Sequence, residues 1–504
     1  MALIETALRN AWILPLCLVL WLLRNRYRLS SVPGPLLNSI SVLPRLWSVY
    51  RGSSHLDDLA LHKKYGKIVR VAPGLVSVSD VSQLDQIYGI SSQFYKSSFY
   101  DPVRLYDEEG ILPDPFVLAD KTLHARMKRN SANAYSLKAL IQLEPLVDGV
   151  IARLFNHLDA TYVETGKTCD IGEYMHFFSM DAIFTVTFGA DLDFISQGDS
   201  KGFCKHVQDG IAYFACCGQV PWAHKFLLGN PYLSRFLAIS GDSILDEILS
   251  IAVAQRQDAE KRILEAEHET AQATFLMTLL RNQAKSPSAI NDREINAHAI
   301  GNIMAGGDTT STALRAALRH LIDNPDVLAR LLEELRQAGI TPETPVSYAV
   351  ASRVPYLTAV IRESMRLHPS VGMLLSRAVP DAGGLLSDGK RQYRVDAGID
   401  VGINPWIIHR DPDIFPDPET YRPDRWLLSS PAQLAAMNRA WIPFGAGRHM
   451  CSGQHISLLE ITKLIPAIVM RYHMQWEDAD VSVTNHFFTI QSGMRVSLQR
   501  KKQE

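Results

Sequence analysis

The ten residues FGAGRHMCSG, at positions 444–453, constrain the fold of this chain more than any other stretch. Its three glycines have no side chains, so the backbone can approach a flat ligand closely. The residues ISLLEITKLIPAIVM that follow have helical periodicity, so we expect Cys451 just before a helix N-terminus. The helix dipole and the neighbouring Arg448 and His449 would favour a thiolate over a thiol. The pattern predicts a functional thiolate beside open backbone, although most lone cysteines are small buried hydrophobes.

The overall composition limits the classes of protein that the chain can belong to. It has 504 residues, of which 47% are hydrophobic, and this is ample for a large buried core. The net charge of −2 leaves no basic surplus, so we do not expect nucleic-acid binding. The six cysteines are irregularly spaced and form no CxxC pair. This cysteine usage fits a reducing compartment and disfavours both a disulfide framework and a structural zinc site.

Most of the chain has the periodicity of helices. Residues 137–165 and 243–282 show long amphipathic patterns, and Asn324-Pro325-Asp326 is typical of a helix start. Strand patterns are confined to short patches, at residues 65–80 around Pro73-Gly74, at 389–402 and at 481–498. The sequence therefore predicts a mostly α fold with small β-sheets.

The N-terminal segment has the character of a membrane anchor. Residues 11–23 are uncharged and apolar, and Arg24, Arg26 and Arg28 follow at once. An arginine excess after the apolar run predicts that the rest of the chain stays cytoplasmic. We expect an anchor over residues 1–29, a proline-rich hinge over 30–36 and a catalytic domain over 37–504. Because the run covers only about 20 Å of a roughly 30 Å hydrocarbon layer, a partly inserted helix or a short signal peptide are the alternatives.

A second motif, AGGDTT, occupies residues 305–310 within a helical pattern. Two adjacent glycines in a helix cost roughly 1 kcal/mol each relative to alanine, a cost that is often accepted where a helix opens for a ligand. Asp308 and Thr309 place an acid beside a hydroxyl, a pair that can pass protons to bound dioxygen through water. At helical spacing, His298, Asn302 and Ala305 share the face of Thr309. A glycine-kinked core helix is the alternative.

A third motif places an acid next to a base on one helix. In VIRESMRLHP, Glu363 and Arg366 are three residues apart and hence neighbours, and YRPDRW adds Arg425 further along the chain. By itself the pair would be interpreted as a solvated surface ion pair.

In this order and at these separations, the motifs resemble those of the cytochrome P450 superfamily from about residue 33 to the end. The stretch 444–453 is similar to the haem-binding loop of that superfamily, with Phe444, His449 and Cys451 in characteristic places. The resemblance implies a cytochrome P450 fold and haem b, iron protoporphyrin IX, with Cys451 as the iron ligand. It also implies that the haem lies against Ala305 and that Asp308 and Thr309 are catalytic.

The resemblance assigns roles to other residues too. The Glu363–Arg366–Arg425 group would lock the scaffold beneath the haem and is structural. His124 and Lys128, in LHARMKRNSANAYS, stand where the superfamily has a tryptophan and an arginine that hold a haem propionate. The alignment could instead slip from Lys128 to Arg129. Arg377 matches another propionate-binding place.

We expect the substrate contacts to come from four largely apolar stretches, at residues 110–117, 298–305, 371–375 and 487–491. They predict a hydrophobic small molecule such as a terpenoid, polyketide or alkaloid intermediate. The residues expected to contact it are Val117, His298, Asn302, Val371, Leu375 and Phe488.

The function that the resemblance implies is a haem-thiolate monooxygenase of the microsomal type. It would insert one oxygen atom of dioxygen into its substrate, by hydroxylation, epoxidation or further oxidation. YGKIVRVAPGLVSVSD and FYKSSFYDP are similar to the fungal secondary-metabolism branch, which is pisatin-demethylase-like. Too few residues follow Cys451 for a flavin domain, so electrons would come from an NADPH–cytochrome reductase carrying FAD and FMN on the same endoplasmic reticulum membrane. Arg126, Lys128, Arg129 and Arg448 would form its docking face.

Three alternatives to this function remain open from the sequence. The chain could couple, isomerise or dehydrate its substrate without net oxygen insertion. It could be a haem-binding sensor with no catalytic activity. It could also be a helical, membrane-tethered scaffold that binds no haem.

Overall fold

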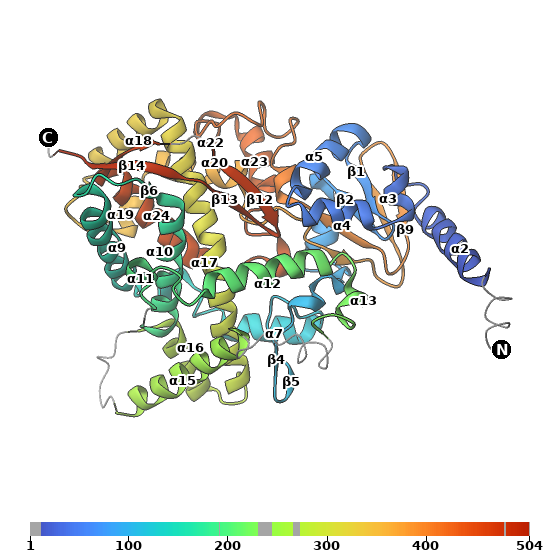
Figure 1. Cartoon of the computed structure of the whole chain (residues 1–504), viewed down its shortest axis with the longest axis horizontal. Coiled ribbons are helices and arrows are strands. Elements are labelled where there is room, and N and C mark those ends of the chain that lie inside the picture. Colours follow the sequence, from blue (N-terminus) through green and yellow to red (C-terminus); the bar gives the residue numbers. More distant parts are fainter. Residues whose placement is uncertain (1–11, 191, 230–243, 266–272, 478–479, 503–504) are drawn as a thin grey trace, which may run out of the picture.

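The computed structural model of the chain describes residues 12–190, 192–229, 244–265, 273–477 and 480–502 (Figure 1). Helices make up most of it, and the strands form small sheets, as expected from the sequence. The helices of eight or more residues are α2 (Ile13–Arg28), α4 (Leu43–Tyr50), α5 (Ser54–Tyr65), α7 (Lys121–Ser131), α9 (Glu144–Leu158), α10 (Ile171–Phe188), α12 (Phe203–Cys217), α15 (Ile244–Glu265), α16 (Phe275–Lys285), α17 (Asp292–Asp323), α18 (Pro325–Gln337), α20 (Pro355–Leu367), α23 (Pro431–Ala440) and α24 (Gln454–Arg471).

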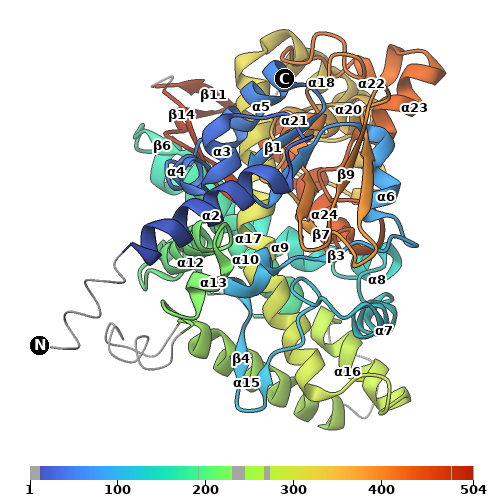
Figure 2. The same cartoon turned by 90° about the vertical axis from the view of Figure 1, so that its right-hand side faces the viewer.

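Helix α17 is the axis of the helical part. It is 32 residues long and begins with a capping box, in which the Asn291 side chain accepts from the Glu294 backbone and the Glu294 side chain accepts from the Asn291 backbone. It packs against α10, α15, α16, α18, α20 and α24 (Figures 1 and 2). The larger hydrophobic core lies around these helices.

The strands form one larger sheet and several small ones. The larger sheet has the order β1 (Ile68–Ala72), β2 (Leu75–Val78), β10 (Asp400–Ile403), β7 (Arg377–Ala378), β3 (Tyr95–Lys96), with a second core beneath it. A three-stranded sheet has the order β11 (Tyr472–Trp476), β14 (Arg495–Arg500), β6 (Cys169–Asp170). The other strands pair two by two, as β12 (Ser482–His486) with β13 (Phe488–Ser492), β8 (Gly384–Ser387) with β9 (Gln392–Val395), and β4 (Tyr106–Asp107) with β5 (Gly110–Ile111).

The strand patches expected from the sequence are therefore confirmed. The first is the antiparallel β1–β2 hairpin around Pro73-Gly74, and the others contain β9 and β10, and β12 to β14. The pattern over 243–282 is divided between α15 and α16, and residues 266–272 between them lie outside the described part of the chain.

The structure does not show the complete membrane anchor that the sequence predicts for the N-terminal segment. Helix α2 covers 16 residues and extends from the side of the molecule that carries the larger sheet (Figure 1). Among the helices in the described ranges, none combines the length and the apolar character needed to cross a bilayer. The expected spanning anchor is therefore not shown, and residues 1–11 of it lie outside the described residues. The hinge that follows packs on the sheet, where the Arg70 amide donates to the Pro33 carbonyl at 2.8 Å.

Candidate functional site

Cys451 lies in a loop that ends where α24 begins. The loop is folded back on itself, with the Cys451 amide donating to the Phe444 carbonyl at 2.8 Å. Two of its glycines have left-handed backbone, with φ of +72° at Gly445 and +60° at Gly447. A Cβ at Gly447 would lie 2.0 Å from the Tyr88 carbonyl oxygen, so only glycine fits there. Close backbone packing, as well as room for a flat ligand, therefore explains why this loop is rich in glycine.

The charge state of Cys451 differs from the sequence expectation. The Cys451 side chain is open to the space beside the loop, but the surrounding protein desolvates the thiol and raises its pKa, although the Gly453 and Gln454 amides and the charge of Lys128 act in the opposite direction. The helix start and the basic neighbours are thus present but do not outweigh desolvation. A coordinating metal cation deprotonates a thiol outright, so this sulfur suits a metal ligand better than a free thiolate.

Five basic side chains gather beside this loop, and we call Lys96, His124, Lys128, Arg377 and His449 the basic cluster. The rings of His124 and His449 have centroids 4.2 Å apart. Strand pairing places Lys96 directly opposite Arg377 on β3 and β7. Burial, reinforced by the neighbouring positive charges, lowers the pKa of His124 to about 4 and that of Lys96 well below its ordinary range. Like charges opposed across strands are destabilising unless an anion compensates them.

The basic cluster has the donors that a dianionic ligand would require. The buried His124 Nδ1, Arg377 Nε and His449 Nδ1 have no hydrogen-bond partner. Lys96 and Arg377 donate to carbonyl oxygens, and in the described part of the chain no member of the basic cluster pairs with a carboxylate within 4.0 Å. Unpaired buried donors are costly, and two carboxylates would satisfy them. The residues present therefore fit the two propionates of a haem.

The structure distinguishes Lys128 from Arg129, the two alternatives that the sequence left open for the propionate-binding place. Lys128 Nζ donates to the Met450 carbonyl at 2.7 Å and so also ties α7 to the Cys451 loop. Arg129, the alternative alignment, is exposed on the outer side of α7. Sequence reasoning missed Lys96. The available signal was a lysine among aromatic residues in FYKSSFYDP, but its neighbour Arg377 is far away in the sequence.

On α17, Thr309 and Ala305 have accessible side chains, whereas most of the flanking residues are buried. Thr309 Oγ1 donates to the Ala305 carbonyl at 2.7 Å, and Ser370 Oγ donates to the Thr309 carbonyl at 2.7 Å. One residue further on, Thr310 Oγ1 donates to Ser457 Oγ at 3.1 Å, which ties α17 to α24 close to Cys451. The hydroxyl of Thr309 and the thiol of Cys451 thus lie on neighbouring elements.

Asp308 faces away from that side, toward α10 and α12. Its Oδ1 lies 3.0 Å from His176 Nε2 and accepts from Gln208 Nε2 at 3.3 Å. Burial would raise the pKa of Asp308, but these hydrogen bonds and the charge of Arg315 outweigh it and lower the pKa. Asp308 is therefore ionised at neutral pH. Adjacent helical residues point about 100° apart, so the expected acid–hydroxyl pair is divided between two faces.

The two glycines before Asp308 have a different explanation from the expected one. Helix α17 is continuous through them, so they do not mark an opening. A Cβ at Gly307 would lie 2.1 Å from Met180 Sδ, and one at Gly306 would lie 2.7 Å from Ile183 Cγ1. Their absent side chains allow the close packing of α10 on α17.

The comparisons with known proteins agree with this geometry. A sequence profile of the family described as Cytochrome P450 matches residues 33–497. The chain belongs to the cytochrome P450 family. It is 33% identical over 486 residues to the cytochrome P450 monooxygenase cicH of Emericella nidulans, with 95% of each chain covered. It is 31% identical to a cytochrome P450 monooxygenase of Aspergillus terreus, with 94% of this chain and 97% of the relative covered. It is also 31% identical to mpaDE' of Penicillium brevicompactum, of which it covers 58%.

This membership confirms the family inferred from the motifs and makes the chain a P450 monooxygenase with a haem cofactor. The haem-binding candidates of this P450 are Cys451, Phe444, Ala305 and the basic cluster, which meet around the start of α24. Phe444 contributes its carbonyl to the Cys451 amide and is partly buried against the core.

Glu363, Arg366 and Arg425 form a buried group in this P450. Arg366 Nη2 and Nε each donate to Glu363 at 2.9 Å, and Arg425 Nε donates to Glu363 Oε1 at 2.8 Å. Trp426 Nε1 adds a further donor at 2.9 Å. Glu363 and Arg366 are completely buried, so the surface ion pair considered from the sequence is excluded. The group joins α20 to the segment that contains Arg425.

The six expected substrate contacts fall into separate places in the P450. His298 and Asn302 lie on α17 near Tyr135, whose hydroxyl donates to Asn302 Oδ1 at 2.8 Å. Val371 pairs with Phe488 in an isolated bridge. Val117 is buried. The Leu375 carbonyl accepts from the Tyr88 hydroxyl at 2.9 Å, close to the Cys451 loop.

An aromatic cluster, which sequence reasoning did not assemble, lies near Phe488. It consists of Phe99, Tyr100, Phe116, Phe214 and Phe487. The ring centroids of Phe214 lie 4.8 Å from those of Phe99 and 5.1 Å from those of Phe487. Phe487 has a left-handed backbone with φ of +80°, which is strained for a side chain of this size. The sequence shows each aromatic residue separately, but the segments that carry these residues come together only in the folded protein.

Proposed function

We propose that this P450 inserts one oxygen atom of dioxygen into a hydrophobic small molecule. The step would tailor a terpenoid, polyketide or alkaloid in fungal secondary metabolism. The observation that carries the proposal is the approach of two elements, with the Cys451 thiol at the start of α24 and the Thr309 hydroxyl on α17, joined by the Thr310–Ser457 hydrogen bond. The fungal sources of the similar monooxygenases support the biological setting.

Each group would have a distinct task. Cys451 would hold the haem iron, and the basic cluster would bind the propionates. Haem bound through a thiolate supplies the activation of dioxygen, and the protein supplies orientation, protons and exclusion of water. The lone pairs of Thr309 Oγ1 can order a water on the accessible face of α17. Asp308 Oδ1 lies against His176 Nε2, so a proton can pass directly between these atoms.

A reaction with labelled oxygen tests the proposal. The metabolite that accumulates when the gene is deleted in its host serves as substrate. The purified enzyme receives this metabolite, NADPH, a P450 reductase and isotopically labelled dioxygen. One labelled oxygen atom in the product is the expected result. An unlabelled product formed at the same rate would contradict it and indicate coupling, isomerisation or dehydration.

Replacing Thr309 by valine should divert electrons from product to hydrogen peroxide. Valine keeps the shape of the side chain but cannot order water, so we expect product formed per NADPH to fall on the order of tenfold or more, with haem binding retained. The measurement is the ratio of product to NADPH consumed. Thr312→Val is the matched control, because Thr312 makes the same type of bond to a helix carbonyl but is fully buried. Unchanged coupling in Thr309→Val would remove this hydroxyl from the mechanism.

A basic surface hollow supports docking of an electron-donating reductase. It has a volume of about 530 Å³ and lies beside α7 and the Cys451 loop. Its lining contains Lys121, Arg126, Arg129 and Arg448, and the last is only three residues from Cys451. Complementary charge accelerates association more than it strengthens final binding. The hollow would therefore receive an acidic face of an NADPH–cytochrome reductase that carries FAD and FMN.

Reversing the charge of Arg129 should slow electron delivery. We expect Arg129→Glu to reduce the rate of P450 reduction by the reductase about tenfold at low salt, with a smaller effect at high salt because ions screen the interaction. Stopped-flow reduction under carbon monoxide measures this rate. Arg394→Glu is the matched control, because Arg394 is exposed but lies on β9. Equal slowing in both variants would refute a docking role.

We also propose that the N-terminal segment attaches the enzyme to the endoplasmic reticulum membrane, with the catalytic domain facing the cytoplasm. Apolar side chains of α2 are exposed, and they include Leu16, Leu20 and Trp21. Arg24, Arg26 and Arg28 follow them and favour the cytoplasmic side. Release of the enzyme from membranes on deletion of residues 1–29 supports this attachment.

A further inference from the structure

A group of polar side chains lies beside α17, one helical turn before Ala305. Gly301 and Ala305 are four residues apart, so they share one face of the helix, and this face is accessible at both positions. Because Gly301 has no side chain, Asp114 from the loop after β5 can lie over the helix at this point. A Cβ at Gly301 would be 3.6 Å from Asp114 Oδ1, so a larger side chain would collide with the carboxyl group.

The loop that carries Asp114 is fixed to α17 by an arginine. Arg293, in the first turn of α17, donates from Nε and Nη2 to the Asp107 carboxylate on β4, at 2.6 and 2.7 Å. The same Nη2 donates to the Ile111 carbonyl at 2.8 Å. The fold therefore sets the position of Asp114 before any ligand binds.

The Asp114 carboxyl group has no cationic partner. Its Oδ1 accepts from the Phe116 amide at 2.9 Å, and among the described residues no lysine, arginine or histidine nitrogen lies within 4.0 Å of it. The side chain is partly accessible, but the surrounding protein desolvates the carboxyl and raises its pKa, against the Phe116 amide and the charge of Lys96. A carboxyl group can accept a hydrogen bond in either protonation state, so Asp114 is available to a ligand.

Two further polar side chains at this place have a buried atom without a partner. The Tyr135 hydroxyl donates to Asn302 Oδ1 at 2.8 Å, which leaves Asn302 Nδ2 buried and without an acceptor. His298 Nε2, one turn earlier, is also buried and unpartnered. Burial, and after it the charge of Asp114, raises the pKa of Tyr135, so these groups are close enough to interact. A buried donor without an acceptor is costly, and a ligand that supplies the acceptor removes this cost.

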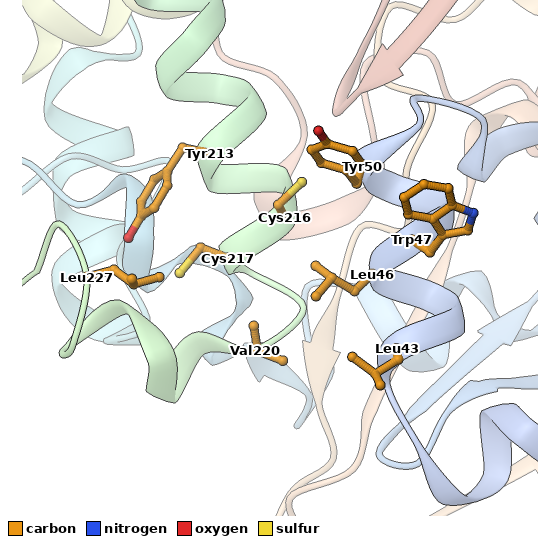
Figure 3. A pocket seen from close by; sticks show the side chains of 9 residues that line it. All are labelled: Leu43, Leu46, Trp47, Tyr50, Tyr213, Cys216, Cys217, Val220 and Leu227. Carbon is orange, nitrogen blue, oxygen red and sulfur yellow. The ribbon is translucent and has the colours of Figure 1, made fainter.

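Unpartnered polar atoms are not common to every hollow of this molecule. An apolar hollow of about 540 Å³ lies on the surface between α4 and the end of α12, where the side chains in Figure 3 face each other. Within the described ranges, none of the side chains that line it has a buried nitrogen or oxygen atom without a partner. The site on α17 is therefore suited to a polar group, whereas the apolar hollow is not.

We propose that Asp114 and Asn302 bind a hydroxyl group of the substrate, so that the substrate is an apolar molecule that carries an alcohol or a phenol. This inference rests on the proposed function, because it concerns the substrate of the same site. Along α17 the rise from Gly301 is about 6 Å to Ala305 and about 12 Å to Thr309. The hydroxyl group would therefore lie roughly 6–12 Å from the carbon atom that is oxidised.

A hydroxyl group matches the polar atoms of this site better than the other common polar groups do. It can donate to the Asp114 carboxyl and accept from Asn302 Nδ2 at the same time. A ketone has no proton for Asp114, and an ammonium group has no lone pair for Asn302. The charge of Asp114 would repel a carboxylate.

Binding of imidazole probes to the haem-loaded, full-length enzyme tests this inference. The imidazole nitrogen binds haem iron and shifts the Soret band, so an absorbance titration gives the dissociation constant. The other nitrogen carries an alkyl chain, in a series of lengths, that ends in a hydroxyl, methyl, ammonium or carboxylate group. At the best length we expect the hydroxyl probe to bind about tenfold more tightly than the methyl probe, the effect of a hydrogen bond to a carboxylate.

Two variants remove the polar atoms one at a time. Asp114→Leu should weaken binding of the hydroxyl probe about tenfold, and Asn302→Leu about fivefold, because the second loses only a bond between neutral groups. The methyl probe should bind both variants as tightly as it binds wild type, which shows that the haem and the apolar part of the pocket are intact. Glu108→Leu is the matched control, because Glu108 is an acid in the turn between β4 and β5 but is exposed, and it should leave both dissociation constants unchanged.

Three results would refute the inference. The first is equal binding of the hydroxyl and methyl probes at every chain length. The second is a preference for hydroxyl that both leucine variants, at 114 and at 302, retain. The third is tighter binding of the ammonium probe, which would assign Asp114 to a cationic substrate, or of the carboxylate probe, which would point to Lys96. The titrations need haem but no turnover, so their outcome is independent of the labelled-oxygen experiment.

Discussion

Cys451→Ala will abolish the red-shifted thiolate band of the reduced carbon monoxide complex, and with it all monooxygenase activity. Within the described chain, the other cysteines lie on other elements, Cys17 on α2, Cys169 on β6 and Cys204, Cys216 and Cys217 on α12, so none of them belongs to the loop. Alanine cannot ligate iron, so we expect activity to fall by several orders of magnitude. Absorbance spectra and haem content of the purified variant measure the effect.

The matched control is Cys204→Ala, which removes a buried thiol on α12. This variant should keep the thiolate band. The basic cluster is intact in Cys451→Ala, so some haem should still bind through its propionates, with a different spectrum. A normal thiolate band in Cys451→Ala would show that another side chain holds the iron and would overturn the whole account of the site.

The second large effect concerns stability. Glu363→Ala should lower the free energy of unfolding by about 3–5 kcal/mol, because it leaves two buried arginines without their carboxylate. Arg366 would keep hydrogen bonds to the carbonyls of His409 and Pro418, but its charge would be uncompensated. Urea denaturation followed by circular dichroism measures the change. Asp85→Ala is the control, because Asp85 also pairs with an arginine, Arg439, at 2.8 Å, but both side chains are exposed.

The same carboxylate makes stability depend on pH. Burial alone would raise the pKa of Glu363, but the hydrogen bonds and charges of Arg366 and Arg425 lower it below that of the unfolded chain. A group with a depressed pKa in the folded state stabilises the protein above its unfolded pKa, about 4.3 for glutamate, and loses this contribution as pH falls. We expect Glu363→Gln to flatten the fall in stability below about pH 4. An identical acid profile for wild type and Glu363→Gln would contradict this role.

The basic cluster can be recognised as a candidate binding site because several of its buried nitrogen atoms lack hydrogen-bond partners. Lys96 and Arg377 face each other across strands, and the Nδ1 atoms of His124 and His449 are buried without a partner. This arrangement by itself destabilises the folded protein, and a bound dianion would compensate that cost. Because a ligand that binds only the folded state stabilises it by mass action, haem should contribute strongly to the stability of this P450.

Local sequence predicted those features that depend on neighbours along the chain. Glu363 and Arg366 are one helical turn apart, so their contact follows from their spacing. The glycines around Cys451 predict an open loop before a helix. The order of these motifs identified the family. Spacing also predicted that Asp308 and Thr309 share a helix, but not that the carboxylate turns toward His176 and Gln208.

The sequence by itself determined the family, because the motifs occur in a fixed order along the chain. It also determined the contact between Glu363 and Arg366, because that contact depends only on backbone geometry within one helical turn. Only the tertiary structure decided that Lys96 stands opposite Arg377, that Gly306 and Gly307 serve the packing of α10, and that desolvation outweighs the neighbouring charge in setting the pKa of Cys451. Those outcomes depend on desolvation and on contacts between segments distant in the sequence. Such contacts are set by the packing of the whole core, and no local pattern of residues specifies them.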